Sequence, residues 1–328
     1  MKPTLCVTVD TEEEGLWGDR FPATGNSVTN IAGLPRFQGL CDRFGVRPTY
    51  LVDTPVVEDD RAAEILSDFA QAGRCEIGSH LHPWCAAPLE GESDAARSFM
   101  CNLPESLQRE KLRRLTEQLE ERFGRRPVSF RAGRYGLDIV GARILEELGY
   151  RVDSSVISFS NYRDQGGPSF EDAPFTPYHV GGDDLARPAA TGNLLEVPVS
   201  VGFNRRRFDT AHRLQRMASR PGLRRLRLVG VMDRTRLVRK IKFSPEQADA
   251  GQMRLLVDTY MANQAPCMVM LLHSSSLVPG LSPYVGTARR LEKLYDDLDD
   301  VFSYCRDRYG TQGQTLSQFA ETYLSQSA

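Results

Sequence analysis

Short β-rich runs alternate with amphipathic helical stretches along the whole sequence, and this alternation leaves few classes of fold open. Such a pattern favours a parallel α/β sheet or barrel, because parallel strands need a crossover, usually helical, between them. The apolar runs suit strands that are covered on both faces. Strands are predicted at 4–10, 48–53, 75–80, 128–133, 150–155, 194–200 and 267–273, and helices near 34–44, 60–72, 105–123, 137–148, 245–262, 286–308 and 316–325. The tetrapeptide SPEQ, Ser244 to Gln247, predicts the start of the helix near 245–262, with Ser244 as N-cap and Gln247 completing a capping box.

Two segments interrupt this rhythm. Residues 157–192 are dense in glycine, proline and aspartate, which predicts a long surface excursion near the site. Residues 205–242 hold fourteen basic residues against two acidic ones and predict a basic helical insertion. We therefore expect a single domain, 1–328, with insertions at about 157–192 and 205–242.

The amino-acid composition gives expectations about the binding partners and the cellular location of the protein. The hydrophobic share of 41% and the charged share of 26% are those of an ordinary globular protein. A net charge of −2 predicts no nucleic-acid partner. No stretch resembles a signal peptide or approaches the ~20 apolar residues of a spanning helix, so we expect a cytoplasmic protein. The seven cysteines are odd in number and form no C-x-x-C pair, which favours reduced thiols over a zinc-cysteine site.

Several predicted strands end in a polar or reactive residue. The sites of parallel α/β folds lie outside the carboxyl ends of their strands, so these side chains are expected on one rim. The residues are Asp10, Asp53, His80, Arg131, Asp153, Ser200 and His273.

The stretch EIGSHLHPW predicts a metal site. His80 and His82 stand at i and i+2, so in an extended segment both rings point to one face. With Glu12, from the VDTEEEG stretch that also holds Asp10, they form a His-His-carboxylate set that leaves a divalent ion open positions for water and substrate. Zinc is the first candidate, and cobalt, nickel, manganese and iron also suit these ligands. The simpler alternatives are two polar loop histidines and a solvated acidic turn.

Further candidates lie beside the other strand ends. Arg131 of FRAGRYG can hold a carboxylate, while Gly133 lets the backbone approach a ligand closely. His273 of MLLHSSS is a natural proton donor, kept charged by Asp153 or another acidic residue. Substrate-binding candidates are the aromatic residues Trp84, Tyr135 and Tyr162, for which packing at the barrel mouth is the alternative.

The order and spacing of TVDTEEE, EIGSHLHP, FRAGRYG, VDSS and LLHSS resemble the motifs of the NodB-homology polysaccharide deacetylases, carbohydrate esterase family 4, and especially their biosynthetic-cluster relatives. The resemblance spans about residues 4 to 275 and implies an irregular (β/α)7-type barrel. By this resemblance Asp10 is the general base, Arg131 orients it, His273 is the general acid, and Glu12, His80 and His82 are the metal ligands.

The chain departs from that family in two motifs. The family's first motif has adjacent aspartates, where this chain reads Asp10-Thr11-Glu12. The histidines of its second motif are four residues apart, whereas here they are two apart. Thr11 and Glu13 are therefore further candidates for the ligand set.

The resemblance implies a metal-dependent hydrolase that removes N-acetyl groups from an amino sugar or glycan precursor in surface polysaccharide biosynthesis. A lipid- or nucleotide-linked precursor would suit the basic segment 205–242, which also suits peripheral membrane contact; the alternative is a solvated insertion. The rival functions are hydrolysis of another linear or cyclic amide C–N bond, as by allantoinase-like or imidase-like enzymes, and a non-catalytic carbohydrate-binding or scaffold role.

Overall fold

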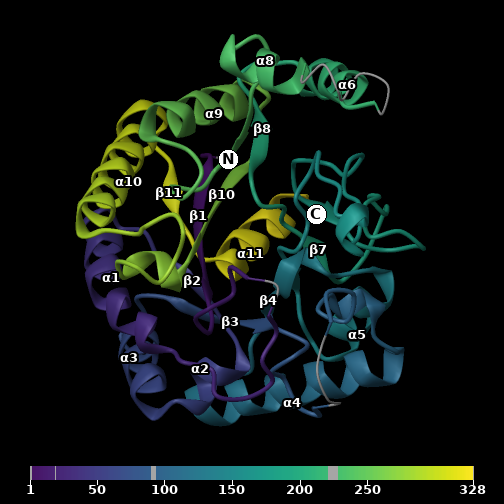
Figure 1. Cartoon of the computed structure of the whole chain (residues 1–328), viewed down its shortest axis with the longest axis vertical. Coiled ribbons are helices and arrows are strands. Elements are labelled where there is room, and N and C mark those ends of the chain that lie inside the picture. Colours follow the sequence, from purple (N-terminus) through teal and green to yellow (C-terminus); the bar gives the residue numbers. More distant parts are fainter. Residues whose placement is uncertain (1, 19, 90–93, 221–227, 328) are drawn as a thin grey trace.

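The computed structural model describes residues 2–18, 20–89, 94–220 and 228–327, and its centre is a curled parallel sheet inside a ring of helices (Figure 1). The spatial order of the parallel strands is β10, β1, β2, β3, β4, β5, β7. Their bounds are β1 Thr4–Thr11, β2 Thr49–Val52, β3 Glu76–Leu81, β4 Ser129–Ala132, β5 Val152–Asp153, β7 Leu195–Glu196 and β10 Cys267–His273. Short strands extend the sheet: β6 (Tyr178–His179) runs antiparallel to β7, and β11 (Gln312–Gly313) runs parallel to β1. The irregular barrel predicted from the sequence is confirmed.

The barrel closes irregularly between β7 and β10. The backbone N–H of Ser200 donates to the oxygen of Val269 at 3.1 Å, and the N–H of Val269 donates to Oγ of Ser200 at 2.8 Å. The chain that follows β7 thus replaces a regular ladder. It continues into a two-stranded antiparallel ribbon of β8 (Val201–Phe203) and β9 (Lys240–Lys242).

Helices cover the outer face of the sheet (Figure 1). Their bounds are α1 Leu34–Arg43, α2 Thr54–Glu58, α3 Asp60–Gln71, α4 Glu105–Phe123, α5 Ile139–Glu147, α9 Ala250–Ala262 and α10 Ala288–Tyr309. The C-terminal helix, α11, spans Leu316–Ser327. Short 3-10 turns are η1 Thr29–Gly33, η2 Met100–Asn102, η3 Gly133–Tyr135, η4 Arg163–Gln165 and η5 Ser274–Leu277.

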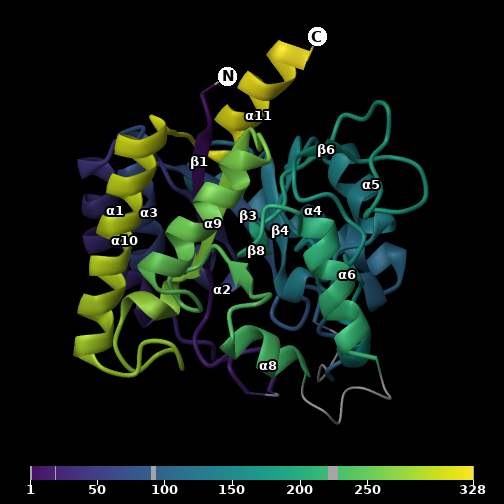
Figure 2. The same ribbon diagram turned by 90° about the horizontal axis from the view of Figure 1, so that it is seen from above.

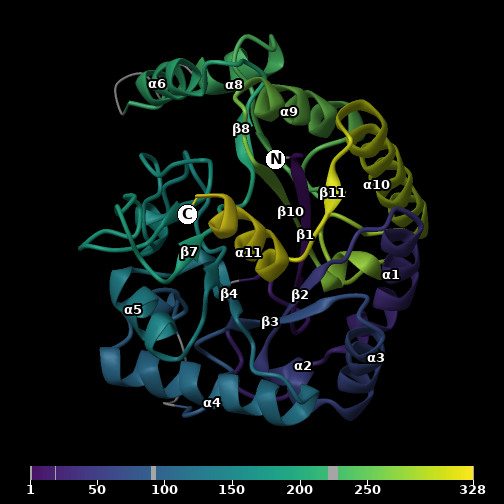
Figure 3. The same ribbon diagram turned by 180° about the vertical axis from the view of Figure 1, so that it is seen from behind.

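Alternation along β1 separates the outer core from the interior of the barrel. Leu5 and Val7 pack in the main core with the surrounding helices, while Cys6 belongs to a second apolar cluster that includes Leu316 and Phe319 of α11. Figure 3 shows α11 lying across the opening of the barrel near the start of β1. Since α11 packs at that end, the interior is open to ligands at the carboxyl ends of the strands.

The two predicted insertions lie beside the barrel. The segment 157–192 contains η4 and β6, and the segment 205–242 contains α6 (Phe208–Ala218) and α8 (Leu228–Arg234). Residues 221–227 of the basic segment lie outside the described residues. Figure 2 shows α8 at the end of the molecule opposite the two termini, the end toward which β1 runs. Within the described part of the chain, no helix combines the length and the apolar character needed to cross a bilayer.

One predicted boundary is wrong. Ser244 does not begin a helix: α9 starts at Ala250, and its N-cap is Asp249, which forms a capping box with Gln252. Residues 244–247 and 249–252 both carry a capping pattern, but the turn at 244–249 is held by a tertiary contact. The carboxylate of Glu246 accepts the backbone N–H of His273 at 2.9 Å. That contact keeps the turn out of the helix.

Candidate metal centre and active site

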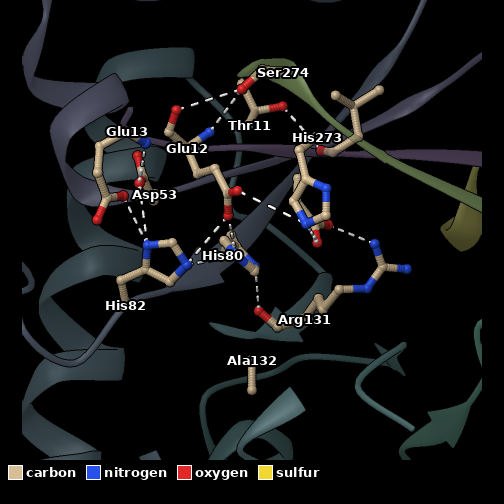
Figure 4. Close-up of polar contacts among 12 residues, drawn as sticks. Thr11, Glu12, Glu13, Asp53, His80, His82, Arg131, Ala132, His273 and Ser274 are labelled. Carbon is tan, nitrogen blue, oxygen red and sulfur yellow. Dashed lines mark hydrogen bonds and ion pairs between the residues drawn. The ribbon is translucent and has the colours of Figure 1, made fainter. Parts of the chain in front are cut away.

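Polar ends of four strands meet at the carboxyl rim of the barrel (Figure 4). The ladder pairs Asp10 of β1 with His273 of β10, and His80 of β3 with Arg131 of β4. Within each pair the two side chains stand at the same level, and the register through β2 places His80 two residues beyond the level of Asp10. Glu12 follows directly after β1, and Figure 4 shows its carboxylate between the rings of His82 and His273.

His80 presents a free lone pair to the centre of this group. Its Nδ1 lies 2.8 Å from the backbone oxygen of Arg131. A carbonyl oxygen only accepts hydrogen bonds, so we infer that Nδ1 carries the proton and that Nε2 is free to bind a cation. The ring is buried, which holds it in this orientation.

His82 is oriented in the same way by a carboxylate. Its Nδ1 lies 2.8 Å from Oε2 of Glu13, whose other oxygen accepts the indole N–H of Trp84 at 2.7 Å. The ring of Trp84 also stacks on the imidazole, with centroids 4.3 Å apart. A side chain at Gly133 would overlap Cδ2 of His82 and lie 2.8 Å from the oxygen of Leu81, so glycine there leaves room for the ring.

Three ligand atoms form a compact triangle. Nε2 of His80 is 3.1 Å from Nε2 of His82 and 3.1 Å from Oε2 of Glu12, and Nε2 of His82 is 3.3 Å from the same oxygen. Ligands about 2.1 Å from one ion, at angles of about 90–110°, lie about 3.0–3.4 Å apart. The three side chains therefore fit a divalent ion. Burial lowers the pKa of His82, but Glu13 and Glu12 raise it well above its usual value, so the site attracts positive charge.

A second group of ligand-type residues serves to orient His82. Glu13, Asp53 and Cys85 gather on its Nδ1 side. The oxygens of Asp53 accept the backbone N–H groups of Val56 and Glu13, both at 3.0 Å, and Glu13 is engaged as described above. Burial raises the pKa of Cys85, which keeps it a thiol and a poor metal ligand. Of the further candidates, Glu13 thus faces away from the triangle, and Thr11 bonds the backbone oxygen of Val9 at 3.0 Å.

Asp10 and Arg131 form a buried ion pair beside the triangle. Nη1 of Arg131 lies 2.6 Å from Oδ1 of Asp10 and 2.9 Å from Oγ1 of Thr8. Its other nitrogens donate to the oxygen and the hydroxyl of Ser154 at 2.8 and 2.9 Å. Burial raises the pKa of Asp10, but Arg131 and the nearby histidines outweigh it and hold the pKa below its usual range. Asp10 is therefore an ionised carboxylate with one oxygen left for another proton donor.

His273 is held by Glu246, a partner that sequence reasoning missed. Its Nδ1 lies 2.9 and 3.1 Å from the two carboxylate oxygens, and Ser276 donates to the same carboxylate at 2.6 Å. Nε2 faces Asp10 at 3.9 Å and Glu12 at 4.0 Å. Burial lowers the pKa of His273, but Glu246 and Glu12 raise it to about 9. The ring is thus doubly protonated at neutral pH and can donate from Nε2.

The Glu246 contact predicts how His273 titrates. In the metal-free protein, Glu246→Gln should lower the pKa of His273 from about 9 toward its ordinary value of 6.5, because the carboxylate that raises this pKa most is gone. The raised pKa stabilises the fold fully below about 6.5, and this contribution is lost as pH rises through about 9. NMR titration of the ring protons, assigned with His273→Gln, measures the shift. An unchanged pKa would contradict the assigned partner.

The other functional residues that sequence reasoning missed act on the backbone of Glu12. Its N–H donates to Oγ of Ser274 at 3.2 Å, and Asn30 donates to its oxygen at 2.9 Å and to Ser274 at 2.8 Å. No sequence pattern marks Asn30, whereas Ser274 follows a predicted strand end. Asp153, the named candidate partner of His273, instead accepts the hydroxyl of Ser155 at 2.6 Å.

The three aromatic candidates differ in their contacts. Trp84 is 4% exposed, packs under His82 and against Phe21, and also lines the cavity over the triangle, while its contact with substrate stays a prediction. Tyr135 and Tyr162 are half-buried neighbours, with ring centroids 5.6 Å apart. A cavity of about 380 Å³ lies over the triangle and is lined by Tyr135 and Trp17 among others.

A parallel barrel that carries a His-His-carboxylate triangle, an Asp–Arg pair and a His–Glu pair at its carboxyl rim defines the class of fold. It is the NodB-homology deacetylase fold that the ordered motifs predicted. No family model matches the sequence, and no curated protein matches it either.

Solved structures show the same fold at low sequence identity. A protein assigned as a polysaccharide deacetylase from Mycobacterium smegmatis superposes with a TM-score of 0.56 at 19% identity, over 100% of this chain and 92% of that one. A protein assigned as a glycoside hydrolase/deacetylase from Parabacteroides distasonis gives 0.61 at 14% identity, over 99% and 71%. An allantoinase gives 0.51 at 14% identity, over 98% and 89%.

Proposed function

We propose that the protein is a metal-dependent hydrolase that removes the N-acetyl group from an amino sugar. The observation that carries this proposal is the triangle of Glu12, His80 and His82, with the carboxylate of Asp10 and the imidazole of His273 beside it. A divalent ion bound there supplies a water of lowered pKa and polarises the carbonyl of the acetamido group.

The chain's own residues supply the proton transfers. Asp10 takes the proton of the attacking water, and Arg131 holds its carboxylate in place at 2.6 Å. His273 donates from Nε2 to the departing amine, while Glu246 keeps the ring charged and oriented. A backbone N–H near Gly133 to Tyr135 would stabilise the oxyanion. The four residues thus divide the roles of base, acid and their two positioning partners.

The proposed substrate is a carbohydrate precursor, linked to a lipid or a nucleotide, in the assembly of a surface polysaccharide. The deacetylase names of two structural neighbours support a carbohydrate. The basic segment 205–242 suits a phosphorylated precursor and also contact with a membrane surface.

Hydrolysis of another amide C–N bond is the second candidate. The similarity to an allantoinase favours it, because that enzyme's name attaches a different substrate to the same fold. Acetate release from N-acetylated sugars, assayed beside hydrolysis of small ureides and cyclic imides, separates the two reactions. Turnover of the ureides alone would replace the deacetylase proposal.

The metal site is tested by elemental analysis of the purified protein after incubation with zinc, cobalt or manganese. Near-stoichiometric metal is expected in the wild type. Loss of a residue that only supports a metal ligand lowers metal affinity by about 10–100-fold. The double variant His80→Ala/His82→Ala removes two ligands, so it should lower metal affinity by more than this. His179→Ala is the matched control, since this histidine lies on β6 and bonds the backbone oxygen of Gly192 at 2.9 Å. Absence of metal in the wild type would instead support a non-catalytic binding or scaffold protein.

A further inference from the structure

A second cavity, of about 630 Å³, adjoins the cavity over the metal triangle. The two share Trp17, Tyr135 and His273 in their walls. We propose that this larger cavity binds a phosphate or diphosphate group through Lys240 and Lys242, so that the acetylated sugar enters the site as a phosphate ester. The assignment of the sugar rests on the proposed function, whereas the anion site rests on the cavity itself.

Both lysines belong to β9 and stand at i and i+2, so they share one face of the ribbon. Nζ of Lys240 donates to the backbone oxygen of Phe159 at 2.6 Å and to the hydroxyl of Ser160 at 2.8 Å. Nζ of Lys242 donates to the hydroxyl of Tyr135 at 2.8 Å. Both line the cavity.

The partners of these ammonium groups are neutral. Among the residues that the structure describes, no carboxylate lies within 4.0 Å of either Nζ. Arg239 in the same wall differs, because its Nε lies 2.8 Å from Oδ1 of Asp233. Burial, with Lys242 nearby, lowers the pKa of Lys240 to about 8, while Glu171 raises it. Two half-buried cations with no carboxylate in direct contact favour an anionic ligand.

The chemistry of the wall favours phosphate over carboxylate. Carboxylates are recognised best by the planar fork of arginine, but Arg239 is engaged by Asp233 through both Nε and Nη2. Lysine binds phosphate as a compact point charge, and hydroxyl groups can add further hydrogen bonds. Ser160 and Tyr162 bring such groups to the same wall.

Tyr135 connects the anion site to the metal triangle. It lies in η3, directly after β4, and has a φ of 59°, a conformation that non-glycine residues seldom adopt. Its hydroxyl meets Lys242, and its ring borders both cavities. A sugar that spans from one cavity to the other would pass this ring, with its phosphate beside the lysines and its acetamido group over the metal.

The test measures binding of inorganic diphosphate by calorimetry, in chelator, so that neither metal nor turnover contributes. Lys240→Gln/Lys242→Gln should weaken binding by about tenfold or more, since two charge-assisted contacts are lost. The control Arg213→Gln/Arg220→Gln removes the same charge from exposed positions of the basic segment and should change affinity less than about threefold. Equal loss in both double variants, or none in the lysine variant, overturns the site.

A second variant keeps the test independent of folding. Gln247 lines the same cavity and is exposed, so Gln247→Glu adds a negative charge without a change of size. It should weaken diphosphate binding by about threefold or more, with an unchanged melting temperature. Unchanged affinity in this variant, or glucuronate displacing diphosphate equally well, overturns the assignment to phosphate.

Turnover then identifies the source of the phosphate. N-acetylglucosamine carried on uridine diphosphate, and the same sugar on a short polyprenyl diphosphate, are compared in the metal-loaded enzyme. The substrate with the higher kcat/KM identifies the source of the phosphate, provided that Lys240→Gln/Lys242→Gln raises its KM. Lysine-dependent diphosphate binding without any deacetylation would overturn the proposed function but support the anion site. Deacetylation of neutral sugars with lysine-independent diphosphate binding would overturn the anion site alone.

Discussion

Arg131→Met is expected to lower the free energy of unfolding by about 3–5 kcal/mol, because it leaves the carboxylate of Asp10 buried without its cation. Both partners lie inside the barrel: the side chain of Arg131 is 0% exposed and that of Asp10 is 5% exposed. Arg131 also donates to Thr8 and Ser154, so the variant leaves further acceptors unpaired. Urea denaturation of the metal-free protein measures the loss.

An exposed ion pair provides the control for this prediction. Arg36 and Glu292 meet at 2.7 Å, but their side chains are 48% and 61% exposed, so Arg36→Met should cost at most about 1 kcal/mol. Adding Asp10→Asn to Arg131→Met should restore part of the lost stability, because the buried charge is then gone. A loss below about 1 kcal/mol in the single variant would show that Asp10 does not depend on Arg131.

Asp10→Asn is expected to lower kcat/KM for deacetylation by about 10²–10⁴-fold, the usual contribution of a general base. Asparagine keeps the oxygen that accepts the hydrogen bond from Arg131, while it loses the ability to take a proton. Bound metal should stay near the wild-type amount, since Asp10 lies outside the triangle of Glu12, His80 and His82.

Parallel rate and metal measurements separate the role of base from that of ligand. Loss of both activity and metal in Asp10→Asn would make Asp10 a ligand. A kcat/KM within about threefold of the wild type would exclude it as the base. The same preparation of enzyme, loaded with one metal and assayed at one pH, serves both measurements.

Local patterns predicted the elements well where those patterns are strong. The bounds predicted for β10 and for the helix at 105–123 agree with the structure. The continuous apolar run of β10 predicts only a buried strand, and the long amphipathic run at 105–123 predicts only a helix. The start predicted for α9 was wrong, because two capping patterns lie next to each other there and Glu246 accepts a hydrogen bond from the backbone N–H of His273. Local propensity carries no information about that contact.

Local sequence patterns were enough to predict which side chains stand at the rim. Asp10, His80, Arg131 and His273 end parallel strands, and a strand period of two sends them to the interior together. The partners of these side chains follow only from the folded barrel. Glu246 contacts His273 at a sequence separation of 27 residues. Glu13 contacts His82 at a separation of 69 residues, and Tyr135 contacts Lys242 at a separation of 107 residues. Such contacts form only when the barrel closes, because each one joins residues that are far apart in the sequence. The histidine tautomers, the buried ion pairs and the two cavity lysines all depend on these contacts, and no local sequence pattern predicts them.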